Sequence, residues 1–138
     1  MQVAKRFQPY LGRWTSRPGG PGPASGMKCR RILAAFGPYV KLEADWAGAY
    51  QEIALFGRDD AGAAVFWSFT SDGGRSHGTL TEGADIHPDA IAFQARMPAG
   101  MARMLYWPGE EGGFNFAVEA QTPGGWNRFM HHIYDAET

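Results

Sequence analysis

The side chains best suited to chemistry lie near the end of the chain, in residues 125–134 (GWNRFMHHIY). Side chains alternate across a β-strand, so this segment has two faces. One face holds Trp126, Arg128, Met130, His132 and Tyr134. The other face holds Asn127, Phe129, His131 and Ile133. A histidine beside a tyrosine can act as acid and base while an arginine holds an anion, but the two adjacent histidines point to opposite sides and cannot bind one metal ion together.

The face that carries Arg128 is expected to be the inner one. It combines large apolar rings with three polar groups, which is typical of a ligand cavity. A buried arginine needs an anion, a ring face or several acceptors. Two interpretations therefore stay open for Arg128: it covers the ring of Trp14, or it holds the anionic group of a ligand. His132 is either a hydrogen-bonded wall residue or a ligand contact.

The rest of the chain predicts the elements that must position these residues. Helix signals are nearly absent, and short apolar–polar alternations end repeatedly at Gly, Pro and Asp turns, which is typical of an all-β protein. The predicted strands cover residues 8–16, 26–35, 39–47, 50–58, 63–71, 74–82, 90–98, 101–107, 113–121 and 125–135. Short hairpins make neighbouring strands antiparallel, and a long meander tends to close. We therefore expect a closed up-and-down antiparallel barrel of about ten strands.

Alternation along these strands also predicts which residues face inward. The residues expected to contact a ligand are Trp67, Phe69, Met104, Tyr106, Phe116, Arg128, Met130, His132 and Tyr134. Further inward candidates are Leu42, Ile53, Leu55, Val65, Phe93, Met97 and Phe114. A lining rich in aromatic residues and methionine suits a flat apolar ligand, and it suits a filled core equally well.

Composition limits the class of protein. The chain has 138 residues, of which 44% are hydrophobic and 14% aromatic, so residues 1–138 are expected to form one domain. The single cysteine, Cys29, cannot form an intramolecular disulfide, which suits a reducing compartment. No signal peptide or membrane-spanning segment is visible, so we expect a cytoplasmic protein. No metal-ligand spacing stands out, and no metal or cofactor is expected.

The charge is unevenly distributed along the chain. Residues 1–42 contain eight lysines and arginines and no acidic residue. Since the formal net charge of the whole chain is −1, the remaining residues carry a net charge of −9. These basic strands could attract an anionic partner, or they could lie beside acidic strands that offset them locally; we favour the second interpretation. No nucleic-acid or membrane partner is expected, and a homodimer is left open.

Residues 17–26 (RPGGPGPASG) interrupt the strand pattern. Proline lacks an amide donor and glycine resists ordering, so this segment is predicted to be a flexible loop at one rim of the barrel. It is not a phosphate-binding loop, because the spacing is wrong and its prolines remove the amide donors.

Two short motifs resemble known barrel families. Gly12-Arg13-Trp14 resembles the G-x-W signature of the calycins, such as lipocalins and fatty-acid-binding proteins. Residues 56–74 (FGRDDAGAAVFWSFTSDGG) are similar to bacterial lipocalin-like proteins of a domain-of-unknown-function family, which in turn resembles the haem-binding nitrobindins. The resemblance implies that Trp14 plugs the closed end of the barrel. The helical lid of fatty-acid-binding proteins has no counterpart in residues 17–26.

Four functions remain after these observations. The first is binding of a small apolar or amphipathic molecule in the barrel. The second is a small barrel enzyme, an isomerase or hydrolase, that uses His132, Tyr134 and Arg128. The third is a nitrobindin-like haem protein with a histidine of the last strand as axial ligand, and the fourth is a structural domain with a filled core.

Overall fold

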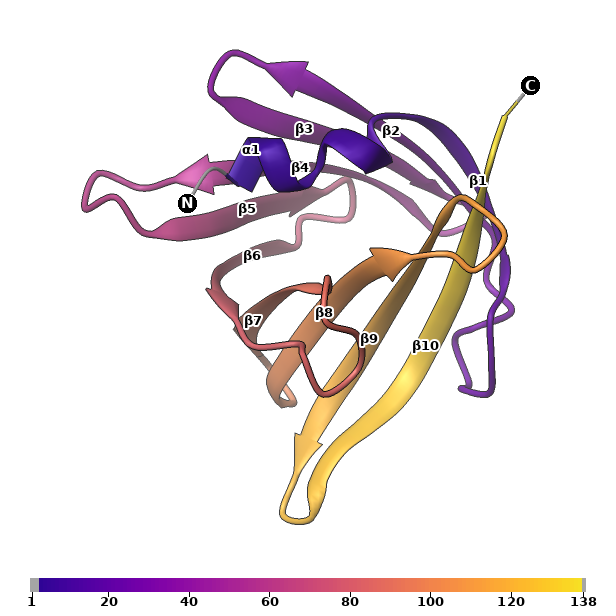
Figure 1. Cartoon of the computed structure of the whole chain (residues 1–138). Helices are drawn as coiled ribbons and strands as arrows, with labels where there is room; N and C mark the ends of the chain where they lie inside the picture. Colours follow the sequence, from indigo (N-terminus) through magenta and orange to yellow (C-terminus); the bar gives the residue numbers. More distant parts are fainter. Residues whose placement is uncertain (1–2, 138) are drawn as a thin grey trace.

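The computed structural model describes residues 3–137. Ten strands form one closed barrel in which each strand pairs antiparallel with its sequence neighbours and the first pairs with the last (Figure 1). The strands are β1 (Gly12–Pro18), β2 (Cys29–Phe36), β3 (Tyr39–Trp46), β4 (Tyr50–Arg58), β5 (Ala64–Thr70), β6 (Arg75–Thr81), β7 (Ile91–Met97), β8 (Gly100–Pro108), β9 (Phe114–Thr122) and β10 (Gly125–Ala136). The expected closed up-and-down barrel of calycin-like form is confirmed.

The short turns set the register of the barrel. In the β4–β5 connection, Asp59 Oδ1 accepts hydrogen bonds from the backbone amides of Ala61 (3.0 Å) and Ala63 (2.9 Å). Gly62 in the same turn has a φ of +84°, in the left-handed region that favours glycine. An aspartate that bonds its own turn and a glycine with positive φ are what a tight hairpin requires.

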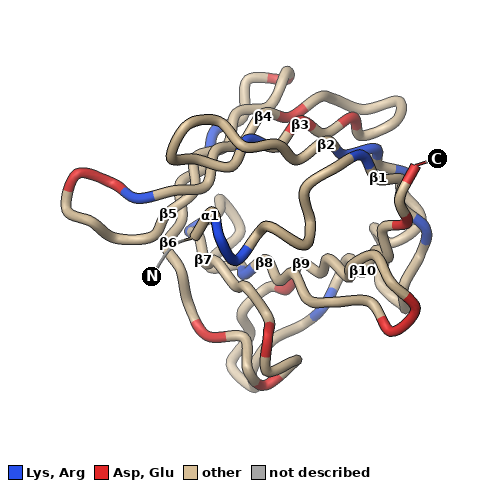
Figure 2. The backbone as a smooth tube through the Cα atoms, turned by 45° about the horizontal axis from the view of Figure 1, so that its top comes forward, with Lys and Arg blue, Asp and Glu red and all other residues tan. Residues whose placement is uncertain are grey.

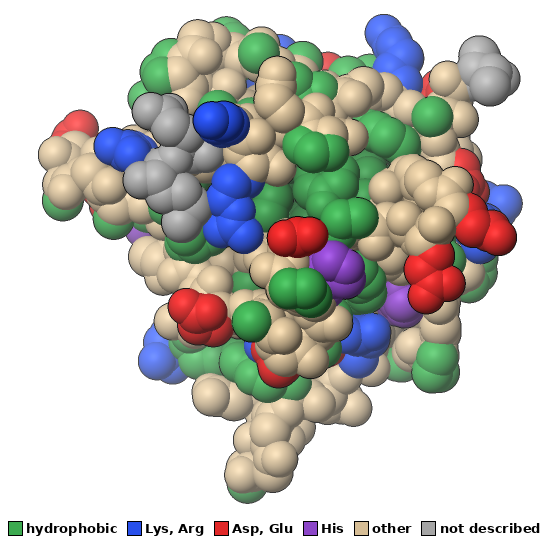
Figure 3. All heavy atoms as spheres, in the orientation of Figure 1, with side chains coloured by type: hydrophobic (Ala, Val, Ile, Leu, Met, Phe, Trp, Pro, Cys, Tyr) green, Lys and Arg blue, Asp and Glu red, His purple; other side chains and the backbone are tan. Residues whose placement is uncertain are grey.

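The N-terminal segment does not begin with the expected strand over residues 8–16. Instead α1 (Val3–Arg6) and a 3₁₀ turn, η1 (Gln8–Tyr10), precede β1. The two elements lie across one end of the barrel (Figure 1), and α1 falls within the barrel outline in Figure 2. In the space-filling view, apolar side chains occupy much of the surface next to this segment (Figure 3). A helix of four residues leaves no periodic signal in the sequence.

Aromatic rings of this segment close the barrel end. The Phe7 ring lies 4.6 Å from that of Phe56, and the Tyr10 ring lies 5.0 Å from that of Phe114. Trp14 packs edge-on against Phe114 at 4.9 Å and donates its indole N–H to the carbonyl of Tyr10 at 2.9 Å. Residues 3–10 thus form an N-terminal plug. Because the acceptor of the buried indole belongs to this plug, Trp14 joins the plug to the barrel wall.

The Pro/Gly-rich connection between β1 and β2 lies along β10. The Gly19 amide donates to the carbonyl of His131 at 2.8 Å, and the Ala24 amide donates to the carbonyl of Phe129 at 3.0 Å. Ser25 Oγ accepts from the His131 amide at 2.9 Å. These bonds continue the wall of the barrel beyond the end of β1. The expected start of the loop is wrong, because Arg17 and Pro18 belong to β1 and pair with β10. The flexibility expected for residues 17–26 stays a prediction.

The basic N-terminal strands lie beside acidic residues of the chain end (Figure 2). Arg17 pairs with Asp135 at 2.8 Å and Arg30 pairs with Glu137 at 2.9 Å. These pairs favour the interpretation that the uneven charge is offset locally. Within residues 3–137, no helix has the length and apolar character needed to cross a membrane.

Candidate ligand cavity

A β-bulge in β10 decides which of its side chains face the barrel interior. Arg128 pairs with Glu119 of β9, but Met130 pairs with the adjacent Val118, so Phe129 is an extra residue. One extra residue reverses the alternation. Met130, His132 and Tyr134 are buried and face inward as expected. Their role as ligand contacts stays a prediction.

The assignment of Arg128 to the interior is wrong, because it lies before the bulge. Its Nε donates to Glu119 Oε2 at 2.9 Å, and its guanidinium lies 5.2 Å from the centre of the Trp107 ring on the outer surface. Trp126, expected beside it inside, also lies outside, under the guanidinium of Arg103 at 4.7 Å. Arg128 therefore neither covers Trp14 nor reaches the interior.

The inward assignment of β4 and β5 is also wrong. Phe66 and Ser68 of β5 are buried inside with Ala54 and Phe56 of β4. The alternate residues, which were expected to face inward, therefore point away from the interior: Ile53, Leu55, Val65, Trp67 and Phe69. Val65 is nevertheless fully buried. Ile53 and Phe69 are 51% and 54% exposed. The side chains on both faces of these strands are mostly apolar, so the alternation of polar and apolar residues did not show which face is the inner one.

The barrel interior contains a partly open cavity of about 230 Å³, whose lining includes Phe56 and Tyr106, the rings that Phe7 contacts. A smaller cavity of about 100 Å³ adjoins it and shares six of its lining residues. Four of the predicted ligand contacts line the larger cavity: Met104, Tyr106, Phe116 and Met130. Leu42 and Met97, from the wider inward set, line it as well. His132 and Tyr134 are fully buried in the adjacent core rather than in the lining.

Arg31 is the principal polar residue that the sequence analysis missed. It is 1% exposed and lines the cavity. Four rings surround its guanidinium: Phe116 at 4.0 Å, Tyr134 at 5.0 Å, Trp46 at 5.4 Å and Tyr106 at 5.9 Å. The alternation of Cys29, Arg31 and Leu33 along β2 is the signal that could have placed it inside.

The hydrogen bonds of Arg31 are incomplete. Nη1 donates to the hydroxyl of Tyr106 at 3.2 Å, and the buried Nε has no partner. Among residues 3–137, no carboxylate forms an ion pair with Arg31 within 4.0 Å. An unpaired buried donor is uncommon and costs about 1–3 kcal/mol. Arg31 is thus held by rings while part of its donor set is unused.

Glu52 is a second charged residue in the lining of this cavity. Its Oε2 accepts from Ser68 Oγ at 2.6 Å and its Oε1 accepts from the indole N–H of Trp46 at 3.1 Å. Arg31 of β2 pairs across the sheet with Ala44 of β3, which pairs with Glu52 of β4. The two charged residues therefore face the interior in one row, with a small side chain between them.

His132 and Tyr134 form a polar pair within the core. His132 Nδ1 lies 3.4 Å from the Tyr134 hydroxyl, and the buried Nε2 has no hydrogen-bond partner. Burial and the nearby positive charge of Arg31 lower the pKa of His132 to about 4. Burial also raises the pKa of Tyr134 well above its ordinary value. Both side chains are therefore neutral near pH 7.

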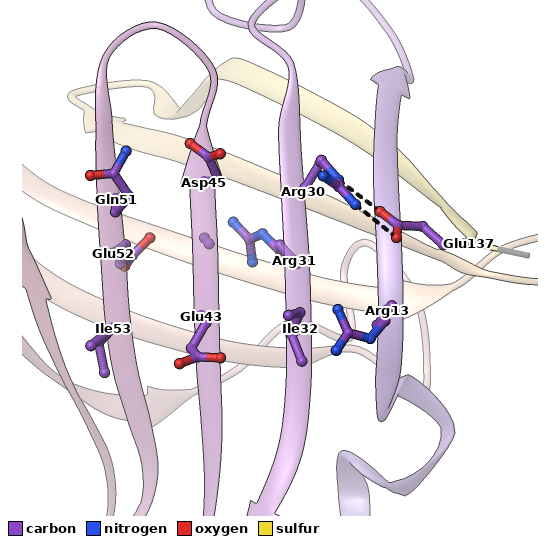
Figure 4. A pocket seen from close by; sticks show the side chains of 11 residues that line it. Arg13, Arg30, Arg31, Ile32, Glu43, Asp45, Gln51, Glu52, Ile53 and Glu137 are labelled. Atoms are coloured by element: carbon purple, nitrogen blue, oxygen red, sulfur yellow. Dashed lines mark hydrogen bonds and ion pairs between the residues drawn. The ribbon is translucent and has the colours of Figure 1, made fainter.

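A larger hollow of about 360 Å³ lies on the outer surface of β1 to β4 (Figure 4). Its charged side chains are of both signs, and Arg30 on its rim is bound to Glu137 through two hydrogen bonds of 2.9 and 3.1 Å. Opposite charges that pair at an open surface give no concentrated field for a ligand. The cavity inside the barrel is the stronger candidate site, because small-molecule sites are concave and mostly apolar.

Within residues 3–137, no group of three or more His, Cys, Asp and Glu side chains is arranged to hold a metal ion. Comparisons with protein-family models, with curated proteins and with solved structures found no match for the chain. The fold and the cavity are therefore the basis for any inference about function.

Proposed function

We propose that the chain is a lipocalin-like binding protein that takes a small amphipathic molecule into its barrel. The observation that carries this proposal is the buried guanidinium of Arg31, whose Nε has no acceptor although it lies in the wall of an apolar cavity. A ligand with a hydrogen-bond acceptor would supply the missing partner, and its apolar part would contact the rings and methionines of the wall.

The volume of the cavity limits the size of the ligand. Small-molecule sites commonly have volumes of about 300–1,000 Å³. The cavity of about 230 Å³ with its neighbour of about 100 Å³ lies at the low end of that range. This supports a compact ligand over a macrocycle such as haem. The acid–base pair of the enzyme alternative gains no support either, because His132 does not line the cavity.

A cavity-filling substitution tests the proposal. Met104 lines the cavity, whereas Met101 lies three positions earlier on the opposite face of β8. Met104→Trp should fill the space that a ligand needs, and Met101→Trp is the matched control. Saturation-transfer NMR would measure binding of small aromatic molecules that carry one carbonyl or hydroxyl group. We expect binding to wild type and to Met101→Trp and its loss in Met104→Trp. Absence of binding to wild type, or equal binding to both variants, would refute the proposal.

A further inference from the structure

We infer that the cavity selects a neutral polar group that combines a hydrogen-bond acceptor with a donor, as in a primary carboxamide. The acceptor would bind Arg31 and the donor would bind Glu52. This inference rests on the proposed function, because it names the class of ligand for the same cavity. It follows from the positions and unused hydrogen-bonding capacity of these two residues.

The two charged residues lie in one row across three strands. Arg31, Ala44 and Glu52 are direct cross-strand partners on the inner face of β2, β3 and β4. Neighbouring strands are about 4.8 Å apart, so the Cα atoms of Arg31 and Glu52 are separated by about 10 Å. Arg31 extends from β2 toward β3 (Figure 4), where the side chain of Ala44 is a single methyl group. Trp46 contacts both charged side chains, and the cavity that Arg31 and Glu52 both line leaves room for a small polar group beside them.

Arg31 needs a hydrogen-bond acceptor. A guanidinium has five N–H donors and no acceptor. The hydroxyl of Tyr106 takes one of these donors, and Nε has no partner. The rings that surround Arg31 stabilise its charge through their faces and leave its N–H groups available. A carbonyl or carboxylate oxygen of a ligand would be such an acceptor.

Glu52 can accept hydrogen bonds from further donors. A carboxylate has about four lone-pair sites, and Ser68 and Trp46 each occupy one, on different oxygens. These two donors also hold the carboxylate in position toward the cavity. An N–H or O–H group of a ligand can therefore bind Glu52 without displacing either partner.

The possible head groups of a ligand differ in how they satisfy Arg31 and Glu52. A carboxylate would be attracted to Arg31 but would bring a second negative charge close to Glu52. An ammonium group would be attracted to Glu52 but would bring a second positive charge close to Arg31. Like charges in a region of low dielectric repel strongly. A carboxamide has a carbonyl acceptor and two N–H donors and carries no charge, so both residues of the cavity are satisfied by it.

Three compounds with the same apolar part test this inference: 4-phenylbutanamide, 4-phenylbutanoate and 4-phenylbutylamine. Calorimetric titration at pH 7 should give the tightest binding to wild type for the amide, by about tenfold or more over each charged compound. Glu52→Gln removes one charge of the cavity, and it should improve binding of the carboxylate relative to the amide by at least about tenfold. Glu43→Gln is the matched control, because Glu43 lies on the outer face of β3, and it should leave the order of the three compounds unchanged.

The outcomes separate this inference from the proposed function. If wild type binds the carboxylate most tightly and Glu52→Gln does not change the order, the carboxamide inference is overturned while binding in the cavity stands. If wild type binds none of the three, and none of the molecules in the wider NMR panel, the proposed function itself is overturned. Arg31→Met gives a second measurement: the folded variant should lose at least about tenfold in affinity for the amide, and unchanged affinity would exclude Arg31 as the acceptor's partner.

Discussion

Lowering the pH should destabilise the barrel, and His132 should make a large contribution to this effect. This imidazole is fully buried, and burial and Arg31 lower its pKa from 6.5 to about 4. In the unfolded chain the same group has an ordinary pKa and takes up a proton from about pH 6.5 downward. The unfolded state therefore binds more protons between pH 6.5 and 4, and the free energy of unfolding falls as the pH falls through that window.

The magnitude follows from the difference between the two pKa values. One unit corresponds to about 1.4 kcal/mol. A pKa lowered to about 4 from 6.5 therefore removes about 2 kcal/mol of stability between pH 7 and pH 5, and about 3 kcal/mol by pH 4. Small domains have a total stability of about 5–15 kcal/mol, so this loss is large enough to measure.

Urea unfolding at pH 7 and pH 5 would test this in wild type and in His132→Phe. The variant keeps an aromatic ring beside Trp46 but cannot be protonated. Its loss of stability between the two pH values should be smaller than that of wild type by about 2 kcal/mol. His77→Phe, at an exposed position, is the control and should behave as wild type does. Equal losses in wild type and His132→Phe would show that folding does not lower the pKa of His132.

Two further substitutions test the packing of the barrel wall. Gly78→Ala should destabilise the fold by about 3 kcal/mol in urea unfolding, since an added Cβ would meet the ring of Phe66 and lie 2.5 Å from the carbonyl oxygen of Gln94. Gly124→Ala is the control, because an added Cβ there has no atom within 4 Å. It should change stability by less than about 1 kcal/mol. Glu119→Gln should lower the urea midpoint by an amount equivalent to about 3 kcal/mol, because Glu119 is 5% exposed and is an ion-pair partner of the buried Arg103; an unchanged midpoint would show that this pair contributes nothing to stability.

The strand order of the barrel could be predicted because turn chemistry is local. Aspartate and glycine in the β4–β5 connection are required by the hairpin itself, and they mark the ends of the strands directly in the sequence. The predicted strand 39–47 is found as Tyr39–Trp46, and the predicted strand 113–121 is found as Phe114–Thr122. A meander with such short links has few ways to pair other than with its sequence neighbours.

The orientation of side chains could be predicted only where one phase of a strand is polar. On β5 the outward Trp67 and Phe69 are as apolar as the inward Phe66, so the choice depends on the space inside the barrel rather than on hydropathy. On β10 the extra residue Phe129 reverses the alternation. Nothing in the sequence of the strand marks that bulge. The carbonyl of Phe129 accepts a hydrogen bond from the amide of Ala24, which lies about a hundred residues earlier in the chain.

The way in which Arg31 is buried connects the fold to the proposed site. A carboxylate within hydrogen-bond reach would neutralise the guanidinium and occupy its donors, as Glu119 and Asp85 do for Arg103 on the outer wall. Inside the barrel, aromatic rings hold the guanidinium instead. The ring faces attract its positive charge but do not act as hydrogen-bond acceptors for the N–H groups in the guanidinium plane. The interior arginine is therefore fixed in position while its Nε donor remains free, which is the condition a binding site must meet before a ligand arrives.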